Sequence, residues 1–178
     1  MHAVNRTKQL AVMAVMAAFS TVLTVLGTVI SINTVFFTAL AAYLAGIMLM
    51  RYGKAPGILF YVVCAMLDFF VNPDKLHVLL YLVLAGYIVF SEFIYCLLSI
   101  SDNKKKGRIH LLLRIIIFVV LYVPLVWFLP QYFVNEKMLQ HTWIFPVLLA
   151  LGVVGWLLFD KAYCVFKRLF MQRFSKLF

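Results

Sequence analysis

The chain contains six long apolar runs, each separated from the next by a short, more polar segment. A helix needs about 20 apolar residues to cross the ~30 Å hydrocarbon core of a bilayer, and these runs approach or exceed that length. Strands of a membrane barrel would instead alternate in polarity over segments of about ten residues, a pattern that is missing here. The predicted spans are residues 10–30, 34–50, 56–71, 76–100, 109–129 and 142–165.

Hydrophobic residues make up 66% of the 178 positions and charged residues only 12%. A water-soluble domain of this length has too little buried volume to hide so much apolar surface. We therefore predict an all-α fold, a compact bundle of six transmembrane helices that forms one domain over residues 1–178. The connections are too short to hold a separate soluble catalytic, nucleotide-binding or DNA-binding domain.

The basic residues predict the orientation of the bundle. Of the sixteen Lys and Arg residues, all except Lys75 and Lys137 lie before the first span, in or beside alternate connections, or near the C-terminus. The positive-inside rule then places both termini in the cytoplasm of a multi-pass cell-membrane protein. We attribute the net charge of +10 to this orientation and not to nucleic acid. The basic and aromatic tail, residues 166–178, is predicted to lie on the anionic inner leaflet as an amphipathic segment.

Arg6 and Lys8 before an apolar run resemble the start of a signal peptide. The run is longer than the 7–15 residues of the usual signal core, and no Ala-x-Ala site closes it. We expect it to be retained as the first span.

Polar residues gather at the connection between the third and fourth spans. Asp68 precedes Asn72 by four residues, so the two share one helix face. Asn72 and Pro73 form a turn signal, and Asp74 has the carboxylate needed to cap the next helix. An ionisable residue inside a span usually faces the bundle interior or a water-filled cavity, although Asp68 could equally serve a hydrogen bond to a neighbouring turn.

The predicted orientation turns this connection outward, together with residues 27–33 and 130–141. Aromatic and polar side chains at this end are the kind that hold a small molecule in a pocket. Tyr132 and Trp143 also fit the interfacial aromatic belt of a membrane protein. The candidate substrate-binding residues are Asp68, Asn72, His77, Tyr81, Asn33, Gln131, Tyr132, His141 and Trp143.

Small residues recur along the first span, where Ala14 precedes Ala18 and Ala17 precedes Thr21 by four positions. Such pairs allow helix backbones to approach closely. They predict either packing within the bundle or a lipid-facing groove for a partner helix. Farther along the chain, Glu92 is predicted to pair with Arg114, because long cations near helix ends reach such groups.

Sequence motifs for catalysis are missing. The chain has no glycine-rich phosphate loop, zinc-protease motif or nucleophile elbow. Cys64, Cys96 and Cys164 stand isolated in apolar runs and predict buried thiols without a disulfide. The histidines are scattered, and the spacing of His77, His141 and Asp68 does not specify a metal site. We predict neither an enzyme nor a bound metal or cofactor.

The layout resembles the substrate-binding S components of energy-coupling-factor (ECF) transporters. The local match is the alanine-rich stretch from Lys8 to Ala18 behind a short basic leader. The resemblance implies an outward pocket for a vitamin or other micronutrient. It also implies that Ala11, Ala14 and Ala18 dock on a transmembrane coupling subunit, which works with two cytoplasmic ATPases. The alternative is a scaffold or assembly protein similar to the MreD-like cell-shape family, and a membrane enzyme is a third, weaker hypothesis.

Overall fold

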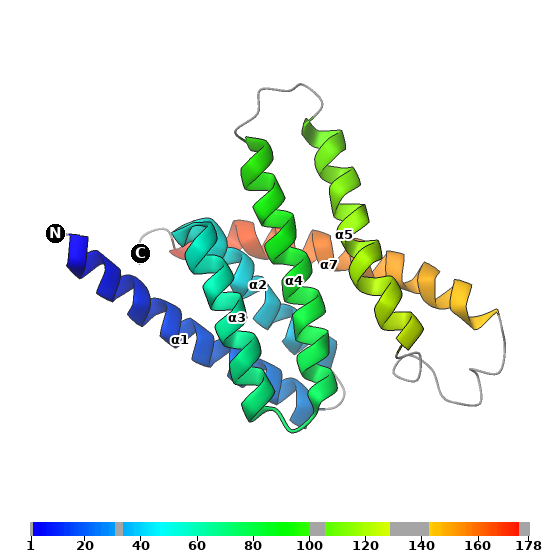
Figure 1. Cartoon of the computed structure of the whole chain (residues 1–178), viewed down its shortest axis with the longest axis horizontal. Helices are drawn as coiled ribbons and strands as arrows, with labels where there is room; N and C mark the ends of the chain where they lie inside the picture. The colour runs from blue at the N-terminus through cyan, green and yellow to red at the C-terminus, as the bar shows by residue number, and fades with distance from the viewer. Residues whose placement is uncertain (1, 31–33, 100–105, 129–142, 175–178) are drawn as a thin grey trace. The chain divides into compact units, whose positions relative to one another are not determined.

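The computed structural model describes residues 2–30, 34–99, 106–128 and 143–174, and they are helical almost throughout. Each of the six predicted spans coincides with a helix that is long and apolar enough to cross a membrane, which confirms the all-α prediction. The helices are α1 (His2–Val29), α2 (Thr34–Tyr52), α3 (Lys54–Val71), α4 (Lys75–Ser99), α5 (Lys106–Phe128) and α7 (Ile144–Phe174) (Figure 1).

Two helices are much longer than predicted. α1 begins at His2 and α7 continues to Phe174, so both extend into the basic flanks of their spans. Lys, Arg and Gln are good helix formers, and neither flank contains a proline that would stop the helix. Part of the predicted surface segment 166–178 therefore continues α7 without a break, and its position on a lipid leaflet stays a prediction.

The chain divides into two compact units, Met1–His110 and Leu111–Phe178. In the first unit α2 contacts α1, α3 and α4. All residues from Ala41 to Leu49 are buried, including the alanines and Gly46. These small side chains let three neighbouring helices approach the α2 backbone, which is how a short helix becomes the core of this unit.

A tight turn joins α2 to α3. Gly53 has a φ of 93°, a left-handed conformation that favours glycine, and its N–H donates to the Leu49 carbonyl at 3.0 Å. Pro56 lies in the first turn of α3, as predicted, where its missing N–H costs nothing. Gly57 follows, and a Cβ at that position would lie 2.3 Å from the Leu49 Cα. The two helices therefore touch through backbone.

The connection between α3 and α4 lies at the same end of the first unit as the end of α1 (Figure 1). The Asn72 N–H donates to the Asp68 carbonyl at 2.9 Å and closes α3. The Asp74 carboxylate accepts a 3.0 Å hydrogen bond from the N–H of Leu76, near the start of α4. The predicted cap is confirmed, and it fixes the direction in which α4 leaves the turn.

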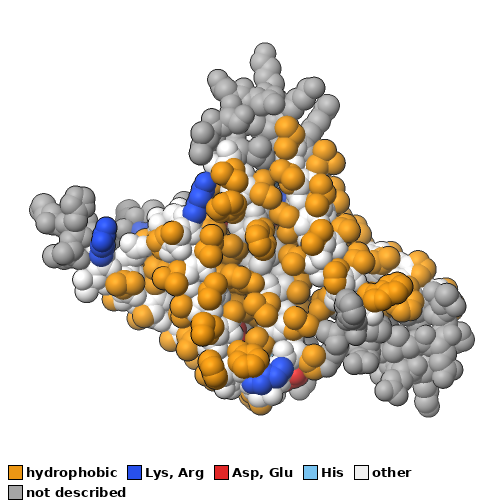
Figure 2. All heavy atoms as spheres, in the orientation of Figure 1, with side chains coloured by type: hydrophobic (Ala, Val, Ile, Leu, Met, Phe, Trp, Pro, Cys, Tyr) orange, Lys and Arg blue, Asp and Glu red, His pale blue; other side chains and the backbone are white. Residues whose placement is uncertain are grey.

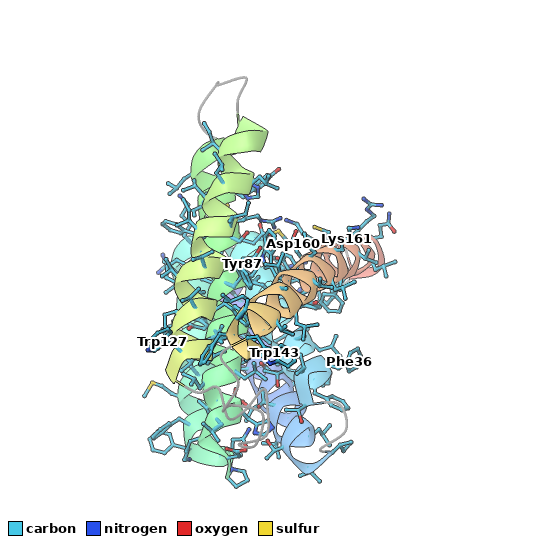
Figure 3. All side chains as sticks on the ribbon, turned by 90° about the vertical axis from the view of Figure 1, so that its right-hand side faces the viewer. Phe36, Tyr87, Trp127, Trp143, Asp160 and Lys161 are labelled. Atoms are coloured by element: carbon cyan, nitrogen blue, oxygen red, sulfur yellow. The ribbon has the colours of Figure 1, made fainter. Side chains whose placement is uncertain are left out.

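The second unit is held by contacts between α5 and α7. The Tyr122 hydroxyl donates to the Leu148 carbonyl at 2.9 Å, and Phe118 stacks on Trp156 with ring centroids 5.3 Å apart. Figure 3 shows Trp127 and Trp143 near one end of this helix pair, and Asp160 farther along α7. Pro124 lies inside α5, as the sequence requires.

Arg114 and Asp160 form an ion pair with an N–O distance of 2.8 Å. This partner of Arg114 was not foreseen in the sequence. Glu92 belongs to the first unit and Arg114 to the second, so their pairing stays a prediction.

The outward sides of the helices are apolar. In Figure 2 hydrophobic side chains cover the displayed face of α3 and α4, and Lys and Arg lie near the helix ends. Phe70 is 77% exposed and Leu59 54%. Large exposed hydrophobic side chains in this number are expected of helices surrounded by lipid hydrocarbon.

Candidate functional site

A group of polar side chains lies between α1, α3 and α4, and all of its members are buried except Thr28, which is half-buried. We call it the Asp68 cluster. Its members are Ser20, Thr21, Thr24, Thr28, Cys64, Asp68, Asn72 and Tyr81.

Two matching hydrogen bonds join α1 to α3 in the cluster. The Thr24 hydroxyl donates to Asp68 Oδ1 at 2.7 Å, and the Thr28 hydroxyl donates to Asn72 Oδ1 at 2.8 Å. Thr24 and Thr28 are four residues apart, and so are Asp68 and Asn72. The two hydrogen bonds therefore lie one helical turn from each other. The bonds fix the register of α1 against α3 and hold Asp68 inside the unit, where it is 0% exposed.

Several polar atoms of the cluster are buried without a hydrogen-bond partner. On α3 these are Asp68 Oδ2 and Asn72 Nδ2, and on α4 the Tyr81 hydroxyl. On α1 they are the hydroxyls of Ser20 and Thr21. An unpaired buried polar atom costs about 1–3 kcal/mol, and native interiors contain few of them. Their concentration around one carboxylate makes the Asp68 cluster the candidate site of this unit.

Tyr81 and Cys64 complete the buried side of the cluster. Both are 0% exposed, and Ser20 lies beside them. The Tyr81 ring is stacked near the Tyr61 ring, with centroids 6.3 Å apart. The Tyr61 hydroxyl in turn donates a hydrogen bond to the Leu82 carbonyl at 3.1 Å. These aromatic contacts hold the Tyr81 ring in one position.

His77, a candidate ligand-binding residue, contacts Asp74 in the structure. Its Nδ1 lies 2.8 Å from Asp74 Oδ2, one turn along α4. The pair belongs to the first turn of the helix, where Asp74 also serves as the cap. His77 thus has a local structural contact, and its role toward a ligand stays a prediction.

The remaining candidate residues are not joined to the Asp68 cluster by the structure. Asn33, Gln131, Tyr132 and His141 lie outside the described residues. Trp143 is exposed and belongs to the second unit. Their roles stay predictions.

Sequence reasoning missed the contribution of α1. Its Ser and Thr residues were interpreted as small packing residues, but Thr24 and Thr28 are hydrogen-bond donors to α3. A signal was present, because the two threonines repeat the four-residue spacing of Asp68 and Asn72. Cys64 is a further missed member, one turn before Asp68 on the buried face of α3.

The small residues of α1 divide between two faces. Ala17 and Thr21 are buried against the bundle, which is the packing role. Ala11, Ala14 and Ala18 are exposed. This second set leaves a stretch of α1 without a bulky side chain at three neighbouring positions.

An apolar groove of about 340 Å³ lies along the outer side of α3 and α4. It is lined by Tyr61, Val62, Ala65, Met66, Phe69, Phe70 and Leu82. None of the candidate substrate-binding residues lines it. Tyr61 and Ala65 of α3 therefore face this groove.

No model of a known protein family matches the chain. No curated protein and no solved structure matches it either.

Proposed function

We propose that this chain is the membrane-embedded substrate-capture subunit of an ECF-type uptake transporter for a vitamin or other micronutrient. In this proposal both termini are cytoplasmic and the ligand enters from the extracellular side. The observation that carries it is the convergence of Asp68, Asn72 and Tyr81, three residues selected from sequence as ligand-binding, in one buried cluster with unpaired polar atoms.

The unpaired atoms offer complementary chemistry to a polar organic molecule. Asp68 Oδ2 is an acceptor, Asn72 Nδ2 is a donor, and the Tyr81 hydroxyl can act as either. A few polar groups of this kind orient a ligand, while aromatic and apolar surface supplies most of the contact area. His77, Asn33, Gln131, Tyr132, His141 and Trp143 would complete the outer part of the pocket.

Transport in this scheme draws its energy from partners. The chain carries no nucleotide-binding motif, so ATP would be hydrolysed by two cytoplasmic ATPases that act through a transmembrane coupling subunit. The exposed positions Ala11, Ala14 and Ala18 on α1 are where that subunit would dock, because side chains this small let a partner helix approach closely.

Ligand binding is tested on the full chain purified in detergent. Native mass spectrometry detects a retained small molecule, and thermal shifts with a panel of water-soluble vitamins identify the class. Asp68→Asn should weaken the affinity about tenfold or more, since a charged hydrogen-bond partner is lost. Asp74→Asn is the matched control, because it removes a carboxylate from the neighbouring turn and retains a capping side chain. Unchanged affinity with lowered thermal stability in Asp68→Asn would give Asp68 a structural role instead.

The partner is tested by co-purification from membranes. Ala14→Leu and Ala18→Leu should abolish recovery of the coupling subunit and ATPases while ligand affinity is unchanged. Val29→Phe, which adds bulk to an exposed position at the far end of α1, serves as the control. Normal recovery with both leucine variants would contradict docking on this face.

The apolar groove on α3 and α4 favours one alternative, a scaffold or assembly protein of the MreD-like kind. Such a protein binds partners through its lipid-facing sides, and an apolar groove suits a partner helix better than a polar nutrient. Recovery of cell-wall synthesis proteins in place of ATPases, together with no retained ligand, would favour this function.

A further inference from the structure

Four of the five unpaired polar atoms of the Asp68 cluster are oxygens, and the fifth is Asn72 Nδ2. The four oxygens are Asp68 Oδ2 and the hydroxyl oxygens of Ser20, Thr21 and Tyr81. All four side chains are more than nine-tenths buried, and they come from three different helices. Thr21 lies beside the Asp68 carboxylate, and Tyr81 lies beside both Asp68 and Cys64. The site therefore presents hard oxygen atoms around a single carboxylate.

The charge of this carboxylate is not balanced by a neighbouring base. Among the residues that the structure describes, Asp68 has no ion-pair contact with Lys, Arg or His, and the side chain that donates a hydrogen bond to it is the neutral Thr24. A lone negative charge in an apolar interior is strongly unfavourable. A stable Asp68 needs one positive charge from elsewhere.

Two ligands of single positive charge fit, a proton and an alkali-metal ion. A proton on Asp68 removes the charge and adds one O–H donor, which can pair with only one of the three hydroxyl oxygens of Ser20, Thr21 and Tyr81. A small metal cation uses the carboxylate charge and the hydroxyl oxygens together, since hard cations select oxygen ligands. A divalent ion would keep an excess positive charge beside only one carboxylate.

We propose that the Asp68 cluster is a binding site for one sodium ion, held by Asp68 Oδ2 and the hydroxyl oxygens of Ser20, Thr21 and Tyr81. Thr24 donates to the other carboxylate oxygen and keeps Oδ2 turned toward the ion. Asp68 lies one turn, about 6 Å, from the end of α3, so the ion has a short path to the helix ends. The site shares Asp68 Oδ2 and the Tyr81 hydroxyl with the proposed nutrient site, and sodium would occupy it in the absence of an organic ligand.

The test measures binding of radioactive sodium to the full chain in detergent by scintillation proximity. Choline chloride keeps the ionic strength constant, and no organic ligand is added. Saturable binding of one ion per chain is expected at neutral and mildly alkaline pH. Asp68→Asn should weaken binding about tenfold or more, and Thr21→Val and Ser20→Ala each several-fold.

Two matched variants serve as controls. Asp74→Asn removes a carboxylate outside the cluster, and Thr38→Val removes a buried hydroxyl outside the cluster, which donates to the Thr34 carbonyl of α2. Both should bind sodium like the unaltered chain. If Asp68→Asn does not fold, the comparison of Thr21→Val with Thr38→Val decides the question.

The proposal is overturned if the unaltered chain shows no saturable sodium binding, or if Thr21→Val and Ser20→Ala bind like the controls. A protonated carboxylic acid at Asp68, seen by infrared spectroscopy in saturating sodium and lost in Asp68→Asn, would overturn it in favour of a proton. Sodium is the only probe in this assay. A chain that fails to bind sodium can therefore still bind a vitamin in the thermal-shift assay, and a chain that binds no vitamin can still bind sodium.

Discussion

Replacing Gly57 by alanine tests the closest helix contact in the first unit. The added Cβ would lie 2.3 Å from the Leu49 Cα, 2.5 Å from its Cβ and 2.9 Å from its Cγ. Ordinary contacts of a Cβ begin at 3.4 Å. Because the nearest atom belongs to the α2 backbone, no rotation of a side chain relieves the overlap. The two helices must move apart by roughly 1 Å.

The magnitude follows from two opposed effects. Overpacking a tight core costs about 1–3 kcal/mol, and a clash with backbone lies at the upper end of that range. Alanine is more favourable than glycine in a helix by up to about 1 kcal/mol. We expect Gly57→Ala to lower the free energy of unfolding by about 2 kcal/mol, which is roughly a thirty-fold change in the unfolding equilibrium.

The assay is an SDS titration of the protein in mixed micelles, followed by circular dichroism. Gly155→Ala in α7 is the matched control, since a Cβ there meets no atom within 4 Å. It should be as stable as the unaltered chain or more stable by up to about 1 kcal/mol. Gly57→Ala with unchanged stability, or an equal loss in both variants, would refute the close approach of α2 and α3.

Three further outcomes are expected. Tyr122→Phe keeps the aromatic ring but removes the hydroxyl bond to α7, and should cost about 0.5–1.5 kcal/mol in the same titration; no loss would mean that the bond is replaced. Arg114→Gln and Asp160→Asn should each destabilise the chain by roughly 1–3 kcal/mol, because the pair is largely shielded, and the double variant should lose less than the sum. A membrane-permeant maleimide should label Cys164, which is exposed, and leave the fully buried Cys64 unmodified until SDS is added. Equal labelling of both thiols in the native state would contradict the burial of Cys64.

The helices could be predicted from sequence because the length of an apolar run is a local property. Their ends were less predictable, since α1 and α7 continue into polar residues that form helix well. The cap at Asp74 was also local and was predicted correctly. The division into two units and the enclosure of α2 depend on which helices become neighbours. The periodicity and spacing of residues in one sequence do not predict which helices will be in contact.

Part of the candidate site was predictable, because the spacing of residues along one helix is also a local property. The four-residue spacing of Asp68 and Asn72 placed both on one face of α3. That this face meets the threonines of α1 is a tertiary fact, because Thr24 and Thr28 lie 44 residues away from their partners. The pairing of Arg114 with Asp160, 46 residues apart, was missed on the same ground.

The enclosure of α2 has a consequence for how the chain is made. Helices emerge from the ribosome in order, so α2 exists before α3 and α4 have been synthesised. Of the three helices that contact α2 in the structure, α1 alone has been synthesised during that interval, and the side that later meets α4 is uncovered. The first unit therefore reaches its final packing only after α4 has been synthesised. The short turn at Asp74 directs α4 onto α2 in that last step.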